Sequence, residues 1–263
     1  MFNLIKKINK LPIKLTIKHY FLFGESGNLL KDKKLDSVES WEVLRVKHPH
    51  FSISSKREEW LRACELEIKK DGQDRGLIKR AKDVVGILEK INVKTIFSVG
   101  VGGAGLEYQI KKIRPDIRLI CSEYSQLNVD LLKSVFWECD SIILFDIKNG
   151  DWKSILGNYG EDILILIYRV DASLTDLEWK RVFQEMFDAG VQNILYIPSG
   201  FLTILSLFYR FRQRLWWKIT NKEMVFAGYL RTEKTFKDYW KSLYDENEII
   251  TGGLKSFLLK KKM

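Results

Sequence analysis

A glycine-rich loop and an acidic residue form the clearest chemical pattern in the sequence. The segment VGVGGAG places Gly100, Gly102 and Gly105 directly after an apolar run, and a helical pattern follows at once. Glycines permit a tight turn and let backbone N–H groups approach a ligand closely. Glu123 ends the next apolar run, 23 residues after Gly100, where a carboxylate can accept hydrogen bonds from both ribose hydroxyls. This order predicts a pocket for a nucleotide-like ligand, and a tight-packing glycine turn without a ligand is the alternative.

A second acid follows the third apolar run. The segment SIILFDIKNGDW places Asp146 at the carboxyl end of this run, beside the same expected crevice. A carboxylate there can accept a hydrogen bond from the exocyclic amine of adenine, and the side chain of Ile147 can pack against the ring. The pattern therefore favours a ligand that contains adenosine.

The elements that would position these residues alternate between strand and helix from residue 93 onward. Strands are expected at 93–99, 117–122, 141–145, 162–168 and 191–198, and helices at about 104–113, 125–137 and 176–188. The strands are nearly apolar throughout, which is typical of parallel strands covered on both faces. Right-handed crossovers on this alternation give a doubly wound sheet. A helix near 201–218, a strand at 224–230, a helix at 232–244 and a strand at 254–260 complete the prediction.

With this order of loop, acid and acid, the chain resembles the class I S-adenosylmethionine-dependent methyltransferases. Their pattern runs from a glycine-rich loop after the first strand to an acid ending the second strand and an acid after the third. The resemblance covers about residues 77–260. It implies an α/β fold with a doubly wound, seven-stranded, mostly parallel sheet whose last strand runs antiparallel. It also implies S-adenosyl-L-methionine as the cofactor and methyl transfer as the reaction.

The resemblance also implies a set of cofactor-binding residues. Around the methionine part of the cofactor it places Gly100, Gly102, Ala104 and the adjoining Gly105. It assigns the ribose to Glu123, with Tyr124 beside the adenine, and it assigns the adenine to Asp146 and Ile147. The sequence departs from the family at two positions. Ser98 stands where the family usually has an acid near the amino group of the cofactor, and Ala104 replaces a glycine.

Two other functions remain open at the level of sequence. Gly100, Gly102 and Gly105 also satisfy the G-x-G-x-x-G pattern of NAD-dependent oxidoreductases, although no Ser/Tyr-x-x-x-Lys or His–Arg constellation accompanies them. Ser98 and Ala104 are also compatible with a catalytically degenerate methyltransferase-fold domain that acts as a binding module.

Residues for acceptor chemistry are expected at the end of the fourth strand, in the segment YRVDAS. Because the methyl group of a sulfonium donor is already activated, the protein mainly positions the acceptor and excludes water. Asp171 is the candidate for acceptor contact or general base, and Arg169 could hold an anionic acceptor. The alternative for Asp171 is a turn residue that precedes the next helix. The sequence does not name the acceptor, and a glycan, a glycolipid or another small metabolite would fit.

Two parts of the chain are expected. Residues 1–76 form a basic and helical extension with little β structure, with capping boxes opening helices at 36–49 and 55–72. Residues 77–263 form the Rossmann-like domain, which begins with a helix at 77–90 and carries a substrate-side helical insertion at about 201–218. The 46% hydrophobic content and the four prolines of the 263-residue chain indicate a globular protein.

The net charge of +10 is concentrated in local patches. One holds the lysines at 6, 7, 10, 14 and 18, and another holds Arg210, Arg212, Arg214 and Lys218 within an apolar, aromatic segment. These patches predict peripheral contact with anionic membranes, whereas solvated faces, or phosphates of a soluble substrate, are the alternatives. For the apolar stripe of residues 201–218, packing on the core is the expectation and an interfacial helix at lipid headgroups is the alternative. Nucleic-acid binding is disfavoured because no recognised RNA or DNA module is present.

The expected location is the cytoplasm. The best candidate for a membrane span, residues 197–209, is too short and contains Pro198 and Gly200. The N-terminal segment lacks the apolar run and cleavage site of a signal peptide. The three widely spaced cysteines suit reduced thiols, and no metal site is expected because His48 and His50 have no further ligands nearby.

Overall fold

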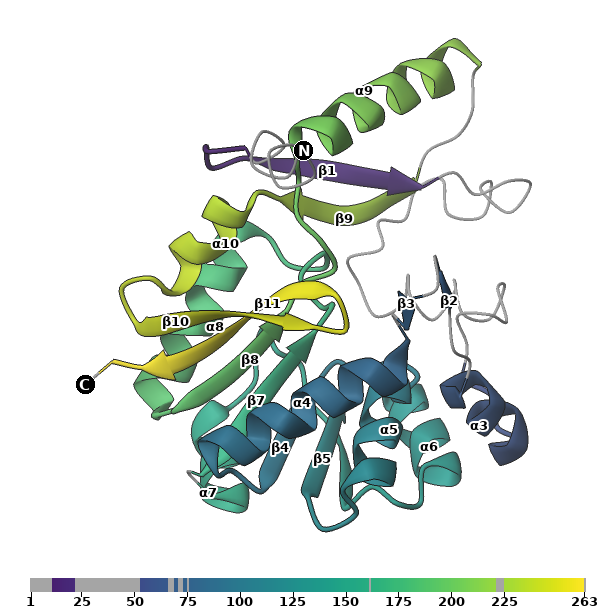
Figure 1. The fold of residues 1–263 in the computed structure, drawn as a ribbon, viewed down its shortest axis with the longest axis vertical. Coiled ribbons are helices and arrows are strands. Elements are labelled where there is room, and N and C mark those ends of the chain that lie inside the picture. Colours follow the sequence, from purple (N-terminus) through teal and green to yellow (C-terminus); the bar gives the residue numbers. More distant parts are fainter. Residues whose placement is uncertain are drawn as a thin grey trace.

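A seven-stranded sheet between two layers of helices forms the body of the protein (Figure 1). The computed structural model describes residues 11–21, 53–65, 69–70, 73–74, 76–160, 162–220 and 225–262. The expected helix at 36–49 and the two histidines beside it lie outside these residues.

The central sheet has the strand order β10-β11-β8-β7-β4-β5-β6. Its parallel strands in chain order are β4 (Thr95–Val99), β5 (Arg118–Glu123), β6 (Ser141–Leu144), β7 (Ile163–Tyr168) and β8 (Asn193–Ile197). β11 (Leu254–Lys261) pairs antiparallel with both β8 and β10 (Tyr244–Thr251). The predicted doubly wound sheet with an antiparallel last strand is therefore confirmed.

Helices cover both faces of this sheet and create two cores. One core lies under α3 (Arg57–Glu65), α4 (Leu77–Ile91), α5 (Gly105–Ile113) and α6 (Gln126–Val135). The other lies under α7 (Trp152–Tyr159), α8 (Asp176–Ala189) and α10 (Glu233–Trp240). Alternate residues of one strand enter opposite cores, as Ile96 and Phe97 of β4 do. The Thr175–Glu178 capping box predicted for α8 is present, with both of its hydrogen bonds.

The sixth strand of the sheet differs from the prediction. The expected strand at 224–230 forms β9 (Val225–Arg231), which pairs antiparallel with β1 (Thr16–Phe21) in a separate two-stranded sheet. Its place in the central sheet is taken by β10, for which no strand was predicted. β10 has the sequence YDENEIIT and exposes most of its middle residues, because it lies at the edge of the sheet. Charged residues suit an exposed edge strand but hide the apolar signal that sequence reasoning uses.

The segment before residue 77 was expected to be a helical extension with little β structure, and its described part contains three strands. β1 lies within it, and the helix expected at 55–72 is described only as α3, from Arg57 to Glu65. Two short strands, β2 (Lys69–Lys70) and β3 (Gln73–Asp74), follow it. The expected Ser55–Glu58 cap is replaced by Ser54, whose hydroxyl accepts from the Lys56 N–H and donates to Glu59.

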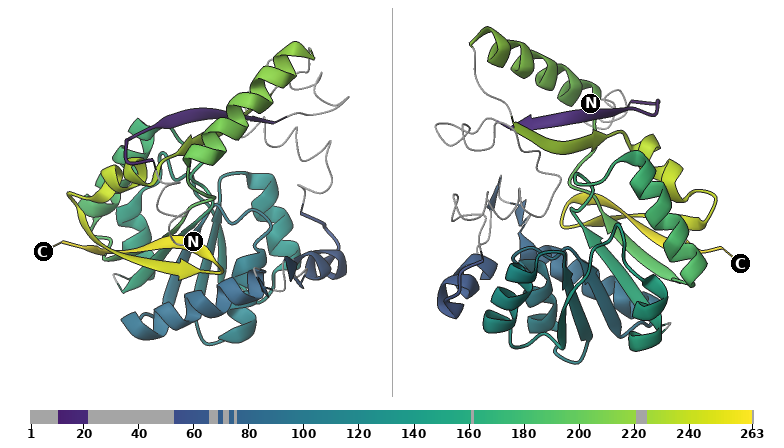
Figure 2. Two further views of the ribbon diagram at one scale, coloured as in Figure 1. Left: turned by 45° about the horizontal axis from the view of Figure 1, so that its top comes forward. Right: turned by 180° about the vertical axis from the view of Figure 1, so that it is seen from behind.

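The β1–β9 pair and α9 (Ile204–Ile219) form a further layer beyond the carboxyl edge of the central sheet (Figures 1 and 2). The predicted helix near 201–218 is thus confirmed as an element. Its only buried residue is Trp217, so the core-packing interpretation of its apolar stripe is wrong. In the described part of the chain, no helix combines the length and the apolar character needed to cross a bilayer.

Candidate functional site

The glycine loop between β4 and α5 has a left-handed backbone at alternate residues. The φ angles are +63° at Gly100, +56° at Gly102 and +54° at Ala104. This region costs little for glycine but strains a residue with a side chain, so Ala104 occupies a position that favours glycine. A Cβ at Gly100 would lie 3.0 Å from the Val170 side chain, which follows β7. The glycine loop therefore packs closely against the residues that follow β7, the strand that pairs with β4.

Glu123 is bound to this loop. Its carboxylate Oε2 accepts a hydrogen bond of 2.9 Å from the Gly102 backbone N–H. The two residues meet because β4 and β5 are adjacent and parallel, so the loop after β4 and the end of β5 share one edge. The Glu123 residue is only 1% exposed. The glycine loop and Glu123 thus lie at one edge of the sheet, and the ribose contact assigned to Glu123 stays a prediction.

Glu107 is a second buried acid at the loop, and sequence reasoning missed it. It lies in the first turn of α5 and accepts a 2.6 Å hydrogen bond from the hydroxyl of Ser98. Burial raises the pKa of Glu107 to about 7, and the nearby charge of Glu123 acts in the same direction. The available signal was an acid within three residues of the glycine loop, on a helix that covers the sheet. Ser98, which departs from the family pattern, is thus joined to a carboxyl group from α5.

The residues after β5 and β6 reach the same edge. Asp146 lies two residues beyond β6, and its carboxylate accepts from the Lys148 N–H at 3.0 Å and from the Asn149 amide at 2.9 Å. Tyr124 is half-buried beside Glu123, whereas the side chain of Ile147 lies in the core under α7 and α8. The adenine contacts assigned to these three residues stay predictions.

Asp171 connects two loops at the carboxyl edge. Its Oδ1 accepts from both the backbone N–H and the hydroxyl of Ser199, at 2.7 and 2.8 Å. Asp171 is 2% exposed, and burial raises the pKa of its carboxyl group. The structure thus places Asp171 with the loop after β8, and its part in acceptor binding or as a base stays a prediction.

Arg169 lies between these two loops and is exposed. Its backbone φ is +60°, and its N–H donates to the Ile197 carbonyl at 2.9 Å. A left-handed conformation at a residue with a long side chain is uncommon and persists only where neighbouring structure imposes it. Here the hydrogen bond to the end of β8 imposes it, and the guanidinium is left accessible.

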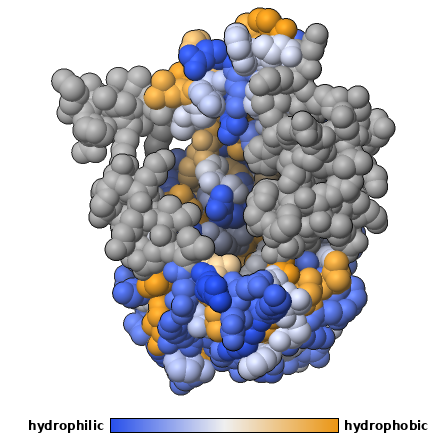
Figure 3. Space-filling model, turned by 90° about the vertical axis from the view of Figure 1, so that its right-hand side faces the viewer, coloured by the Kyte–Doolittle hydropathy of each residue, from blue (hydrophilic) through white to orange (hydrophobic). Residues whose placement is uncertain are grey.

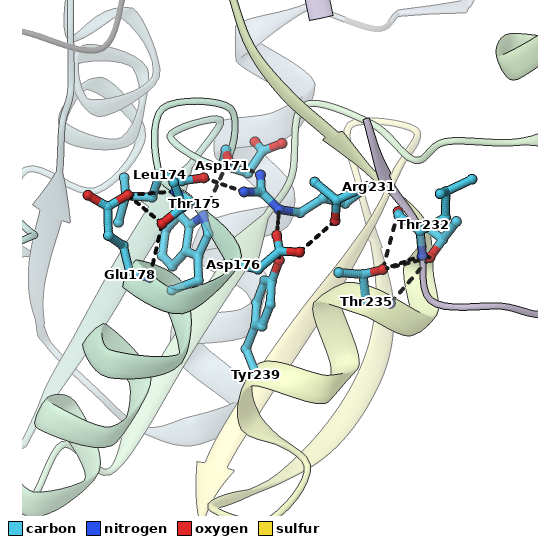
Figure 4. A network of polar contacts seen from close by, with 12 residues as sticks. Asp171, Leu174, Thr175, Asp176, Glu178, Arg231, Thr232, Thr235 and Tyr239 are labelled. Carbon is cyan, nitrogen blue, oxygen red and sulfur yellow. Dashed lines mark hydrogen bonds and ion pairs between the residues drawn. The ribbon is translucent and has the colours of Figure 1, made fainter. Parts of the chain in front are cut away.

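A fully buried arginine attaches the β1–β9 layer to this edge (Figure 4). The Arg231 guanidinium donates to the carbonyls of Asp171 and Leu174 and to the Asp176 carboxylate at 2.7 Å. Asp176 also accepts from the Tyr239 hydroxyl at 2.7 Å and from the Thr16 hydroxyl of β1 at 2.8 Å. These bonds lower the pKa of Asp176. The loop after β7 is therefore held by residues of β1, β9 and α10, none of which was predicted to belong to the site.

The molecule is hollowed between this added layer and the body of the fold (Figure 3). In the orientation of Figure 1, it lies below the β1–β9 pair and above the helices that cover the sheet. Both halves of the candidate site thus meet at an edge of the sheet beside which the surface is concave.

Comparison with known proteins was made by sequence and by structure. No protein-family model matches the chain, and no curated protein matches it by sequence. Human N-acetylserotonin methyltransferase in complex with SAM superimposes with a TM-score of 0.51 and 14% identity, over 91% of this chain and 66% of that enzyme. The chain thus spans slightly less than two thirds of the length of the human enzyme.

Two further structures give lower scores. Streptomyces venezuelae DesVI matches with a TM-score of 0.48 and 9% identity, over 71% of this chain and 92% of its own. The mitomycin 7-O-methyltransferase MmcR matches with a TM-score of 0.47 and 16% identity, over 70% and 54%. At these identities the similarity concerns the fold alone. The match to the human enzyme, together with the strand order, shows the class I methyltransferase fold.

Proposed function

Starting from its class I methyltransferase fold, we propose that this protein binds S-adenosyl-L-methionine and transfers the methyl group to a small-molecule acceptor. The observation that carries the proposal is the hydrogen bond between the Gly102 N–H and the Glu123 carboxylate. It brings together the glycine loop and the acid that the family pattern uses for this cofactor. The fold supports the proposal but does not by itself define a reaction.

The cofactor would lie along the edge formed by the ends of β4, β5 and β6. Glu123 would accept from the ribose hydroxyls, and its bond to Gly102 fixes the orientation of the carboxylate. Gly102 would leave room for the methionine part, because a Cβ there would project into open space, whereas a Cβ at Gly105 would lie 2.8 Å from the Leu77 side chain. Tyr124 and Asp146 would lie beside the adenine, whereas the Ile147 side chain lies in the core under α7 and α8.

We assign the acid that is missing at position 98 to Glu107. Its carboxyl group is bound to the Ser98 hydroxyl, so it supplies negative charge to the end of β4 from a different element. With a pKa of about 7, Glu107 becomes ionised as the pH rises through neutrality. Affinity for a cofactor with a positively charged amino group should therefore rise over the same pH range.

The chemistry required of the protein is mainly positional. The bound cofactor supplies an activated methyl group, and the chain must align the acceptor with it and exclude water. Asp171 fixes the loop that carries Ser199, and the exposed Arg169 would hold an acidic group of the acceptor. A glycan, a glycolipid or another small metabolite with such a group would fit this half of the site.

Calorimetric titration tests the cofactor. We expect the wild-type protein to bind S-adenosylmethionine and S-adenosylhomocysteine and to give no comparable heat with NAD. Glu123→Gln should weaken binding by at least about tenfold, because a charged hydrogen-bond acceptor is worth roughly 1.5–3 kcal/mol. Glu58→Gln, at an exposed position of α3, is the matched control and should leave binding unchanged.

Three outcomes would contradict the proposal. Binding of NAD without S-adenosylmethionine would favour the oxidoreductase alternative. Binding of neither, by protein that is folded by circular dichroism, would favour a degenerate binding module. Cofactor binding that is unaffected by Glu123→Gln would refute the assigned site. If binding is found, release of S-adenosylhomocysteine in the presence of candidate acceptors identifies the acceptor class.

A further inference from the structure

The apolar face of α9 points away from the protein. The large apolar and aromatic residues that are exposed along the helix are Ile204, Leu205, Phe208, Tyr209, Phe211, Leu215, Trp216 and Ile219. Phe208 is 68% exposed and Phe211 is 66% exposed. α9 lies on the outer side of the β1–β9 pair, away from the central sheet (Figures 1 and 2). Contiguous apolar surface of this kind marks an interaction site in a soluble protein.

The opposite face of α9 is polar and is fixed to β1. Arg210, Gln213, Arg214 and Trp217 face β1 and β9. The Arg214 guanidinium donates to the Lys18 carbonyl and lies 4.6 Å from the centre of the Tyr20 ring. Burial, together with Arg210 and Arg214, lowers the pKa of His19 to about 4, so this inner face holds a neutral histidine beside the two arginines. Because these contacts hold the polar side inward, the apolar stripe is left on the outside.

The charge of the exposed face is positive. Arg212 and Lys218 are exposed, and the sequence of α9, ILSLFYRFRQRLWWKI, contains no acidic residue. The structure narrows the basic patch expected from the sequence, because Arg210 and Arg214 face β1 and Lys14 forms an ion pair with Asp238 at 2.5 Å. The lysines at positions 6, 7 and 10 lie outside the described residues.

We propose that α9 lies in the interface of an anionic phospholipid membrane, with its apolar face against the acyl chains and its two exposed cations at the headgroups. An interfacial helix combines an apolar, aromatic face with basic residues that reach the headgroups. Arg212 lies within the apolar face, four residues from both Phe208 and Trp216, so its long side chain would extend along that face to the headgroups. A second copy of the chain fits this face less well, because pairing two such faces would bring four cations together without an acid from either helix. α9 follows β8, so the membrane would lie beyond the carboxyl edge of the sheet, on the side of the candidate site.

Flotation with phosphatidylcholine vesicles, with and without phosphatidylserine, tests the proposal. The wild-type protein should float with the vesicles that contain phosphatidylserine, and added salt should reduce this binding. Phe208→Ser combined with Phe211→Ser should lower the apparent affinity by at least about tenfold, through loss of apolar insertion. Arg212→Gln combined with Lys218→Gln should abolish the preference for phosphatidylserine.

Leu177→Ser is the matched control, because Leu177 of α8 is 80% exposed but lies outside α9. It should bind vesicles like the wild type. Recovery of the wild type in the unbound fraction with both kinds of vesicle, at low salt, would overturn the proposal. So would a phenylalanine double variant that floats like the wild type, or one that instead converts a dimer to a monomer in sedimentation. Titration of the double variant with S-adenosylmethionine separates this result from the proposed function, which does not depend on α9.

Discussion

The two halves of the candidate site are built in different ways. On the cofactor side, Gly102 and Glu123 are joined by a hydrogen bond between residues 21 positions apart, and consecutive elements bring them together. On the acceptor side, Arg231 reaches Asp171 across 60 positions, and Thr16 reaches Asp176 across 160. The first half depends on backbone conformation next to adjacent strands. The second depends on a buried guanidinium that joins separate layers.

This contrast indicates where each half is vulnerable. The cofactor side should tolerate changes in the added layer, because the glycine loop is held by Glu123 of β5, Trp60 of α3 and the neighbouring Val170 rather than by β1 or β9. The acceptor side should lose its shape when the β1–β9 pair is released, because the loop after β7 has its carbonyls paired with Arg231. Substitutions at five positions test this comparison.

Arg231→Met should have the largest effect. It removes the guanidinium donor of two carbonyls that Arg231 pairs in the interior, at about 1–3 kcal/mol for each, and it removes the charge partner of Asp176, whose side chain is 39% exposed. Urea unfolding measures the loss, with Arg212→Met on the exposed surface of α9 as a control that should stay within about 0.5 kcal/mol. Equal stability of the two variants would show that the buried network does not hold the layers together.

Alanine substitutions at two glycines with positive φ, one in each half of the candidate site, should lower the stability of the protein by different amounts. A Cβ at Gly228 of β9 would lie 2.3 Å from the Ala172 carbonyl oxygen, so Gly228→Ala should cost about 3 kcal/mol through overlap and backbone strain. At Gly102 nothing lies within 4 Å of such a Cβ, so Gly102→Ala should cost about 1 kcal/mol through strain alone.

The same urea experiment compares the two glycine variants, and cofactor titration adds a second measurement. Gly102→Ala should weaken binding of S-adenosylmethionine despite its small cost in stability, because the loop must approach the ligand closely. A larger loss of stability for Gly102→Ala than for Gly228→Ala would reverse the comparison.

Glu107 should make the stability of the cofactor half depend on pH. Its pKa is raised from 4.5 to about 7 in the folded protein, so the unfolded chain releases this proton first as the pH rises. The stabilisation of the folded protein by the protonated Glu107 carboxyl group is fully present below pH 4.5 and is lost as the pH rises to about 7. This loss lowers the free energy of unfolding by about 3 kcal/mol.

Glu107→Gln should remove this loss, because an amide can still accept from Ser98 and does not titrate. Unfolding at about pH 5 and about pH 8 measures the difference, with Glu58→Gln as the exposed control. If the free energy of unfolding of the Glu107→Gln protein falls between these two pH values as much as that of the wild type, a group other than Glu107 causes the pH dependence.

Arg169→Gly should have the smallest effect, and it should be stabilising. Relief of the left-handed strain at φ +60° outweighs the added entropy of the unfolded glycine by roughly 0.5–1 kcal/mol. Arg169→Ala keeps the strain and should leave stability unchanged. Thermal unfolding distinguishes the two variants. If Arg169 binds an acidic acceptor, both should raise the KM for it to a similar extent.

The sequence by itself determined the alternation of β4 to β8 with α5, α6 and α8, and the position of the glycine loop and Glu123 within it. The apolar runs of β4 to β8 and the capping box of α8 are local patterns, with periods of two or about 3.6 residues, and they appear in the structure. The glycine loop and Glu123 could be predicted for the same reason. A parallel sheet carries the ends of adjacent strands to one edge whatever the rest of the chain does.

Only the tertiary structure decided which strands pair and which surfaces pack together, where the local sequence pattern is compatible with more than one position in the fold. β9 has the composition of a central strand but pairs with β1, and the charged β10 completes the sheet instead. The apolar stripe of α9 could be predicted from its helical spacing, but this spacing does not indicate whether the stripe packs on a core or is exposed to solvent. The joining of Ser98 to Glu107 and of Arg231 to Asp171 likewise required the packed chain. Long-range contacts of this kind depend on the sum of many weak packing energies, which no short segment of sequence contains.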